Sequence, residues 1–398
     1  MFNTEQRVEN IFLTGATGVL GARLLLEILL TTEACVYCLV RANDQQEARN
    51  RLIELLYVYD PQRRCQSQLW RVIPMVGDVS APLLGLSESD YYELAQGVDR
   101  VIHSAAGVNL LASYPALFDT NVGGTHNIIE LCLLGKVPLL YISSFTVAGR
   151  QLFNDDYRLK ESDLDLGQSF KHMSYARTKF ESELAVHEAG KRGLRWAITR
   201  PGNIWGDSVT GCYPLTETRL KGLYYEVIRA LVETGITFSA PQNFDVSPVD
   251  YVARASLHII LEIDRFASQT FHLTNPTPLS YDGIVDFLQQ YGYRIKRMNN
   301  DDYLAALAEN RLWFQGKPYH SQFTGMLNLF YANIEQGGSL LLDTEFTEQS
   351  LLPAGIACAP SDCRLMFCYF DYLVQRGFLP PPDQQGAMAE VVTLTTSR

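Results

Sequence analysis

Tyr175 and Lys179 lie four residues apart in the segment YARTK, and together they could transfer a proton. In a helix, residues four apart project from one face, so the phenol and the ammonium group would be neighbours. A free tyrosine has a pKa of about 10, and a nearby cation lowers that pKa by stabilising the phenolate. We therefore predict that Lys179 lowers the pKa of Tyr175 and that the phenol donates a proton near neutral pH.

A serine hydroxyl completes the predicted catalytic set. Ser144 ends the apolar run YISS, which has the composition of a buried strand. At a strand end the hydroxyl can orient a carbonyl group that Tyr175 then protonates. The pattern Tyr-x-x-x-Lys occurs by chance in many helices, but a serine and a nucleotide-binding turn at strand ends make the chance interpretation the weaker one. The predicted catalytic residues are Ser144, Tyr175 and Lys179, a set typical of reductases.

The segment IFLTGATGVLG, residues 11–21, reads as an apolar strand, a glycine-rich turn and the start of a helix. Gly15 permits a tight turn, Gly18 lets a pyrophosphate approach the backbone, and Gly21 lets the helix lie close to the strand. The free N–H groups of the helix N-terminus would bind the phosphates. The predicted cofactor-binding residues of this turn are Thr14, Gly15, Thr17, Gly18, Val19, Leu20 and Gly21.

The end of the second predicted strand, LVRA, indicates which nicotinamide cofactor is used. A carboxylate at this position would accept a hydrogen bond from the 2′-hydroxyl of NAD, whereas an arginine can bind the 2′-phosphate of NADP. Arg41 occupies the position, and Arg51 follows one helical stretch later. The alternative is that Arg41 is a solvated surface cation. We predict that the cofactor is NADPH.

Further cofactor contacts are predicted where other strands end. Asp78 and Val79 follow the third strand, where a carboxylate can accept from the adenine amino group. Ser104 and Ala105 are small enough for the cofactor to pass close to the backbone. Asn121 could fix a water or the backbone near the site, or serve as an ordinary helix cap. After the sixth strand, the predicted contacts are Pro201, Asn203 and Ile204. Tyr175 and Lys179 are expected to contact the cofactor as well.

The elements that must position these residues alternate between strand-like and helix-like in the first half of the chain. Such alternation predicts an α/β fold, a Rossmann-type doubly wound parallel sheet that binds ligands beyond the carboxyl ends of its strands. The predicted strands are Asn10–Thr14, Val36–Val40, Arg71–Val76, Arg100–His103, Leu139–Ser143 and Trp196–Arg200. The predicted helices are Val19–Leu30, Gln45–Tyr59, Ser87–Gln96, Pro115–Leu134 and Tyr175–Lys191.

With 398 residues the chain is longer than one core usually is, so two domains are expected. We assign residues 1–205 to an NADP(H)-binding domain, to which segments near 244–262 return. Residues 206–398 form a smaller, mostly helical C-terminal region that is expected to face the substrate. Within it, a helix is predicted at Leu220–Thr234.

Composition excludes several classes of function. The net charge of −11 argues against a nucleic-acid surface, which needs clustered Lys and Arg. The chain has no run of about 18 apolar residues, which a membrane-spanning helix would need. It also shows no secretory signal, so a cytoplasmic protein is expected. Cys35 and Cys38 form a C-x-x-C within a predicted strand, where residues three apart point to opposite faces. No metal site is predicted.

These motifs together resemble the thioester reductase branch of the extended short-chain dehydrogenases/reductases. The branch contains the terminal reductase domains of nonribosomal peptide and polyketide synthetases, and it is close to carboxylic acid reductases and fatty acyl-CoA reductases. The glycine spacing G-x-x-G-x-x-G resembles that of the extended short-chain dehydrogenases in general. The discriminating matches are the stretches GDVSAPLLGL and RPGNIWGDSVTG, because sugar epimerases share the other motifs but seldom these. The matching stretches cover residues 10–256.

The resemblance implies NADPH-dependent reduction of an acyl or peptidyl thioester carried on the phosphopantetheine of a carrier protein. The product would be an aldehyde, or an alcohol after a second hydride transfer. Tyr175 or Ser144 would stabilise the oxyanion. The family often has threonine where this chain has Ser144. Because nine residues precede the first predicted strand, the chain is expected to act on its carrier in trans or to be an excised domain.

Three other functions stay open at this point. A fatty acyl-CoA reductase would perform the same chemistry on a free thioester. A nucleotide-sugar epimerase or dehydratase would hold NAD tightly, which Arg41 opposes. A non-enzymatic NADP-sensing regulator commonly lacks the tyrosine or the lysine, and both are present here.

The carrier protein is expected to be acidic and would dock on a basic patch. Candidates in the second region are Arg219, Lys221 and Arg229, and the alternative is that these charges are simply solvated. The glycine- and aromatic-containing segment 207–245 is predicted to move and to gate the phosphopantetheine arm. The sequence does not identify the acyl group.

Overall fold

The computed structural model describes residues 9–109, 112–149, 158–215, 222–240, 243–299, 301–303 and 340–385. The chain divides into two compact units. Unit 1 comprises Met1–Ile204, Ser247–Thr274 and Leu340–Cys358, and unit 2 comprises Trp205–Val246, Asn275–Ser339 and Ala359–Arg398. In the part of the chain that is described, no helix combines the length and the apolar character that crossing a membrane would require.

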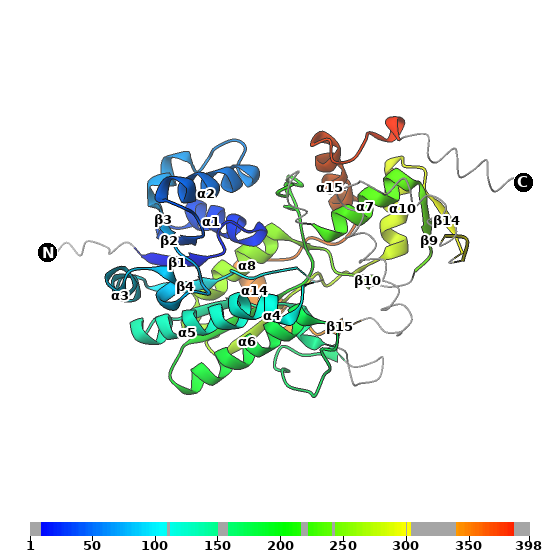
Figure 1. Ribbon diagram of the computed structural model, residues 1–398. Helices are drawn as coiled ribbons and strands as arrows, with labels where there is room; N and C mark the ends of the chain where they lie inside the picture. The colour runs from blue at the N-terminus through cyan, green and yellow to red at the C-terminus, as the bar shows by residue number, and fades with distance from the viewer. Residues whose placement is uncertain are drawn as a thin grey trace, which may run out of the picture. The chain divides into compact units, whose positions relative to one another are not determined.

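Unit 1 is built on a seven-stranded parallel sheet (Figure 1), which confirms the predicted Rossmann-type fold. The strand order is β12-β7-β5-β4-β1-β2-β3, so the direction of winding reverses between β1 and β4. Ligands of such sheets bind beyond the carboxyl ends of the strands at this reversal. The strands are β1 (Asn10–Thr14), β2 (Cys35–Val40), β3 (Val72–Val76), β4 (Arg100–His103), β5 (Leu139–Ile142), β7 (Trp196–Pro201) and β12 (Gln269–Leu273).

The described helices of unit 1 are α1 (Val19–Thr31), α2 (Gln45–Tyr59), α3 (Glu88–Gly97), α4 (Tyr114–Phe118), α5 (Gly124–Gly135), α6 (Ser174–Lys191), α8 (Val249–Leu261), α9 (Ile263–Phe266) and α14 (Glu345–Leu351). Of the five helices predicted in the first half of the chain, all but one begin and end within a residue of the predicted positions. The exception is the predicted helix 115–134, which is α4, a π-helical turn at Asp119–Gly123 and then α5. Such turns insert one extra residue and often occur at functional sites.

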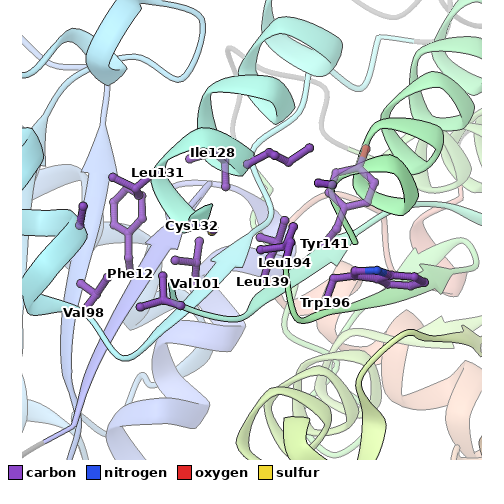
Figure 2. Packing of buried hydrophobic residues seen from close by; sticks show 14 of the residues in the cluster. Phe12, Val98, Val101, Ile128, Leu131, Cys132, Leu139, Tyr141, Leu194 and Trp196 are labelled. Atoms are coloured by element: carbon purple, nitrogen blue, oxygen red, sulfur yellow. The ribbon is translucent and has the colours of Figure 1, made fainter. Parts of the chain in front are cut away.

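The core of unit 1 lies between the sheet and the helices on one of its faces (Figure 2). Phe12, Val101 and Leu139 come from three strands of the sheet and are fully buried, as are Ile128 and Leu131 of α5. Strands covered on both faces read as continuous apolar runs, which explains why the sequence located them well. Each fully buried side chain of this size stabilises the fold by about 1.5–3 kcal/mol relative to an exposed one.

Two segments of unit 1 lie in the range that the sequence assigned to the second region. One is α9 and the edge strand β12, which pairs with β7. The other is the segment 340–358, whose short strand β15 (Leu341–Leu342) pairs with β6 (Arg158–Leu159). This segment also contacts β12, because Thr347 Oγ1 accepts from the backbone N–H of His272 at 2.9 Å. The polar residues of β12 interrupt its apolar pattern, so its strand signal in the sequence was weak.

The described part of unit 2 contains the helices α7 (Leu223–Thr234), α10 (Tyr281–Tyr291) and α15 (Cys363–Gln375) and two small sheets. One sheet pairs β9 (Ile236–Phe238) with β14 (Lys296–Met298), and the other pairs β10 (Asn243–Phe244) with β13 (Leu279–Ser280). Aromatic side chains form much of its interior: Trp205 stacks on Tyr369, with ring centroids 5.7 Å apart, and Phe238 stacks on Tyr281 at 5.3 Å.

Candidate functional site

The glycine-rich turn after β1 has a backbone that only glycine accommodates well. Gly15 has a φ of +74°, and a Cβ atom there would lie 2.6 Å from the carbonyl carbon of Ser104. A Cβ atom on Gly21 would overlap the carbonyl oxygen of Gly15. The N–H of Gly18 donates to that same oxygen at 2.8 Å, which closes the turn at the start of α1. The turn therefore brings a helix N-terminus to the carboxyl edge of the sheet, as an anion site requires.

A buried chain of hydrogen bonds joins the ends of β1 and β4. Thr125 Oγ1 donates to the carbonyl oxygen of Asn121 at 2.6 Å, so it can only accept from His103 Nε2, which lies 3.3 Å away. His103 Nδ1 then accepts from Thr14 Oγ1 at 2.7 Å, and Thr14 Oγ1 accepts from the N–H of Ala105 at 3.2 Å. Burial lowers the pKa of His103 to about 3, so this imidazole is neutral near pH 7. The Thr14 hydroxyl thus holds the backbone that follows β4.

The three predicted catalytic residues lie on two neighbouring elements of unit 1. Ser144 follows β5 and caps a short 3₁₀ turn at Phe145–Ala148, and Tyr175 and Lys179 lie on the first two turns of α6. Ser144 and Tyr175 share a side-chain hydrogen bond. Lys179 is 2% exposed, and its Nζ donates to the carbonyl oxygen of Ile142, the last residue of β5, at 2.7 Å. The structure therefore brings the serine hydroxyl to the phenol and the lysine to the strand end beside it.

The pKa of Tyr175 is shifted upward, whereas the sequence predicted a lowered pKa. Burial raises the pKa of Tyr175 to about 12, and the hydrogen bond with Ser144 opposes this shift. Burial also lowers the pKa of Lys179 to about 7, although the carboxylate of Glu183 acts the other way. The helical spacing correctly placed the two side chains on one helix, but it could not show that burial dominates both pKa values or that Nζ is bound by a backbone carbonyl.

We expect Lys179→Met to show how burial of the lysine affects stability. With a pKa of about 7 in the folded chain and 10.5 in the unfolded chain, Lys179 binds more protons when unfolded between these pH values. The lysine therefore destabilises the fold at pH 7, and this effect disappears as pH rises. Chemical denaturation at pH 7, 8 and 9 should show Lys179→Met as the more stable protein at pH 7, with the difference shrinking by about 1 kcal/mol per pH unit. A difference that is independent of pH would contradict the shifted pKa.

Asn121 links the loop after β4 to the helix of the catalytic tyrosine. Its Oδ1 accepts from the N–H of Gly107 at 2.7 Å, and its Nδ2 donates to the carbonyl oxygen of Gly107 at 3.1 Å. The same Nδ2 donates to Thr178 Oγ1 at 2.9 Å, and Thr178 Oγ1 donates to the backbone carbonyl of Tyr175 at 2.8 Å. The sequence left two interpretations of Asn121 open. In the structure Asn121 fixes the backbone near the site. The π-helical turn directs it there.

At the ends of β2 and β3, Arg41 and Asp78 face each other. Arg41 Nη1 lies 4.0 Å from Asp78 Oδ2, and the Arg41 side chain is 73% exposed. Arg51 donates to the backbone carbonyl of Arg41. Asp78 Oδ1 accepts from the backbone N–H and the hydroxyl of Ser80 at 2.9 and 2.8 Å. An exposed guanidinium held beside a fixed carboxylate is accessible to a phosphate, so the geometry is compatible with the predicted role of Arg41.

The other predicted cofactor residues lie along the same edge, but some of their side chains face the core. Leu20 and Val79 are buried, so a cofactor could reach only their backbone atoms. Asn203 accepts from the N–H of Ser247 at 3.0 Å through its carbonyl oxygen. Pro201 ends β7, and Ile204 lies in the short strand β8 (Ile204–Trp205). The residues with partly accessible side chains or backbone are Thr17, Gly18, Val19, Ser104, Ala105, Asn203 and Ile204.

The structure describes the predicted docking patch and gate of unit 2 only in part, and both stay predictions. Arg219 and Lys221 lie outside the described residues. Arg229 is not a freely solvated cation, because it pairs with Glu226 at 3.2 Å and its guanidinium lies 3.9 Å from the ring centroid of Phe378.

The described start of the predicted gate is held by three tyrosines of unit 2. Tyr225 Oη accepts from the N–H of Gly206 at 2.8 Å, and Tyr369 donates to the carbonyl oxygen of Gly206 at 3.1 Å. Tyr372 donates to the carbonyl oxygen of Tyr213 at 2.9 Å. These bonds fix residues 206–213 to α7 and α15.

A buried ion pair that the sequence did not indicate lies next to the catalytic helix. Arg200 Nη2 lies 2.7 Å from Glu183 Oε2, and neither side chain is exposed. The same Nη2 donates to the carbonyl oxygen of Asp163 at 2.7 Å, and Nη1 lies 3.2 Å from His272 Nε2. Glu183 stands one turn after Lys179 on α6. The signal available in the sequence was an arginine inside the apolar strand WAITRP.

Among the residues that the structure describes, no three His, Cys, Asp or Glu side chains are grouped in a way that could hold a metal ion.

Comparison with known proteins agrees with this geometry. The family model described as male sterility protein, an NAD-binding family, matches residues 13–256. One relative is a component of the linear gramicidin synthase of Brevibacillus parabrevis. It is 30% identical over 92% of the chain, and the chain spans only 7% of that protein's length.

Two solved structures extend the similarity over most of the chain. The terminal R domain from the myxalamid PKS-NRPS biosynthetic pathway is 30% identical with a TM-score of 0.83, covering 94% of this chain and 92% of that one. A thiolation-reductase di-domain from an archaeal nonribosomal peptide synthetase shares the fold at 24% identity, with a TM-score of 0.74 and coverages of 93% and 91%. The chain belongs to the male sterility protein family of extended short-chain dehydrogenases/reductases and, within it, to the terminal reductase domains of nonribosomal peptide and polyketide synthetases.

Proposed function

We propose that this chain uses NADPH to reduce an acyl or peptidyl thioester to an aldehyde, with the thioester carried on the phosphopantetheine arm of a carrier protein. The observation that carries the proposal is the hydrogen-bonded pair of Ser144 and Tyr175 with Lys179 on the same helix as the tyrosine. The glycine-rich turn lies on the same sheet edge, at the reversal of strand order. Reduction of a carbonyl group needs both a cofactor site and a proton donor, and unit 1 contains candidates for each.

The residues of the site fit the proposed reaction. Bound NADPH would supply a hydride to the thioester carbonyl carbon. Tyr175 would hydrogen-bond to the carbonyl oxygen as negative charge develops on it, and Ser144 would support the phenol through their shared hydrogen bond. The C–S bond then breaks, the carbonyl re-forms as an aldehyde, and the carrier thiolate takes up a proton. Lys179 would hold the nicotinamide ribose, for which its position one turn after Tyr175 on α6 is suited.

The relatives support a carrier protein as the partner. The similar proteins include a component of a peptide synthase and a structure in which a thiolation domain and a reductase domain are joined. We propose that unit 2 faces the carrier and the acyl group.

Arg41 is expected to be a main reason for a preference for NADPH. Arg41→Ala should raise the KM for NADPH by about tenfold or more, because a charge-assisted bond to the 2′-phosphate contributes about 1.5–3 kcal/mol. The KM for NADH should change little, because NADH lacks this phosphate. Arg192→Ala provides a matched control, since Arg192 is also exposed but pairs with Glu130. Steady-state kinetics with both cofactors make the comparison, and equal losses for NADPH and NADH would reject the role of Arg41.

The proposed function is tested by mass analysis of the products. The chain is incubated with NADPH and a panel of acyl groups, each offered on a carrier protein and as the matching acyl-CoA. Aldehyde formed preferentially from the carrier-bound thioester supports the proposal. Preference for acyl-CoA would favour a fatty acyl-CoA reductase, and oxidation of no NADPH with either form would contradict thioester reduction.

A further inference from the structure

The hydroxyl of Ser144 receives two hydrogen bonds from a single residue. Ser144 Oγ accepts from the backbone N–H of Thr146 at 3.3 Å. The Thr146 hydroxyl lies 3.0 Å from the same Oγ atom and donates to it. Both donors come from the short turn that Ser144 itself caps. Thr146 was not among the residues that the sequence indicated.

This arrangement constrains where the Ser144 proton can point. A serine hydroxyl has one proton to donate and two lone pairs that accept. Both lone pairs of the Ser144 oxygen accept from Thr146. Only the Ser144 proton therefore remains for the hydrogen bond with Tyr175. Ser144 would then donate to the phenolic oxygen, and the phenol's own proton would point away from Ser144. That is the orientation in which Tyr175 can donate to a substrate oxygen.

We propose that Thr146 is a positioning residue that fixes the direction of the hydrogen-bond chain Thr146→Ser144→Tyr175 and so keeps the tyrosine proton available for the substrate. The inference deepens the proposed reductase function and rests on it. Thr146 does not touch the reacting atoms in this role; it acts through Ser144.

The turn that carries Thr146 is held firmly enough for such a role. Val147 and Ala148 are buried, and the carbonyl oxygen of Val147 accepts from Gln168 Nε2 at 3.0 Å. The N–H of Gly149 donates to the carbonyl oxygen of Thr146 at 3.0 Å. Gly149 has a φ of +55°, and a Cβ atom there would lie 2.9 Å from the carbonyl oxygen of Ser169. The backbone that follows Thr146 is therefore held by buried side chains and hydrogen bonds.

The position of Lys179 also bears on the role of the Ser144 hydroxyl beside Tyr175. Lys179 Nζ donates to the carbonyl oxygen of Ile142, so this ammonium group is already directed at the end of β5. The hydrogen bond from Ser144 favours the charged form of the phenol, whereas burial opposes it. A correctly directed Ser144 hydroxyl would therefore assist Tyr175 when its proton leaves.

The test is a double-mutant cycle between Thr146 and Ser144. Thr146→Val keeps the shape of the side chain but removes the hydroxyl, and it is expected to lower kcat about tenfold, the value of one hydrogen bond. The KM values for NADPH and for the thioester should stay within about twofold of wild type, because the lost bond acts on the transition state. Thr146→Ser should restore the rate. In the Ser144→Ala background, Thr146→Val should have no further effect.

Controls separate this role from loss of structure and from failure of the proposed function. Thr31→Val is a matched control, because Thr31 donates to the carbonyl oxygen of Glu27 within α1, away from the catalytic set. Each variant is checked for an unchanged thermal midpoint. The cycle is measured with an acyl thioester and with the matching aldehyde, so that inactivity on thioesters alone rejects the proposed substrate while the aldehyde still tests Thr146. Additive losses from the two residues, wild-type kcat in Thr146→Val, or reduction of neither carbonyl would overturn the inference.

Discussion

Tyr175→Phe is expected to lower kcat by about 10²–10⁴ while NADPH still binds, because a positioned acid contributes on this scale. The phenol acts on charge that develops in the transition state, so its loss should affect kcat far more than KM. The substitution removes a hydroxyl that is hydrogen-bonded to Ser144, and it leaves the aromatic ring in place. Steady-state kinetics and a direct titration of NADPH binding measure the two quantities separately.

Tyr114→Phe is a suitable control for this experiment. Tyr114 lies on α4, and its hydroxyl donates at 2.6 Å to Glu181 of α6, the helix that carries Tyr175. Loss of the Tyr114 hydroxyl therefore also removes a hydrogen bond to α6. We expect it to leave kcat nearly unchanged, because this bond does not involve the catalytic set. Near-wild-type kcat in Tyr175→Phe would mean that the proton comes from another group.

The second large effect concerns stability. Glu183→Gln is expected to lower the free energy of unfolding by about 3–5 kcal/mol, because removing one partner of a buried ion pair leaves an uncompensated charge. Arg200 would keep its bonds to the Asp163 carbonyl and to His272 but lose its carboxylate. Chemical denaturation at pH 7 measures the loss.

Two further variants test whether the unpaired charge is the cause. Glu130→Gln breaks an ion pair with Arg192 in which both side chains are more than half exposed, and it should leave stability nearly unchanged. The double variant Glu183→Leu/Arg200→Met removes both charges and should be more stable than Glu183→Gln. If the double variant is the less stable of the two, packing rather than charge accounts for the loss.

The sequence by itself determined the order of strands and helices in the first half of the chain and the family. β1, β4 and α2 begin and end at the predicted residues. The reason is that strands buried on both faces need continuous apolar runs, while the helices between them need polar faces, and both patterns are local. The turn at Gly15 was equally readable, because a positive φ restricts the residue type at that position.

Only the tertiary structure decided the properties that depend on burial and on contacts between distant segments, such as pKa shifts and strand pairing. The pKa of Tyr175 rises instead of falling because the phenol is desolvated, which the spacing to Lys179 cannot reveal. Asn121 lies in a π-helical turn that interrupts a segment with a helical pattern throughout, and from there it reaches Thr178. β12 joins the sheet 68 residues after β7 ends (269 against 201), through backbone pairing that leaves no local pattern. Spacing reports which side chains share a face, whereas desolvation and pairing across the chain depend on the folded environment.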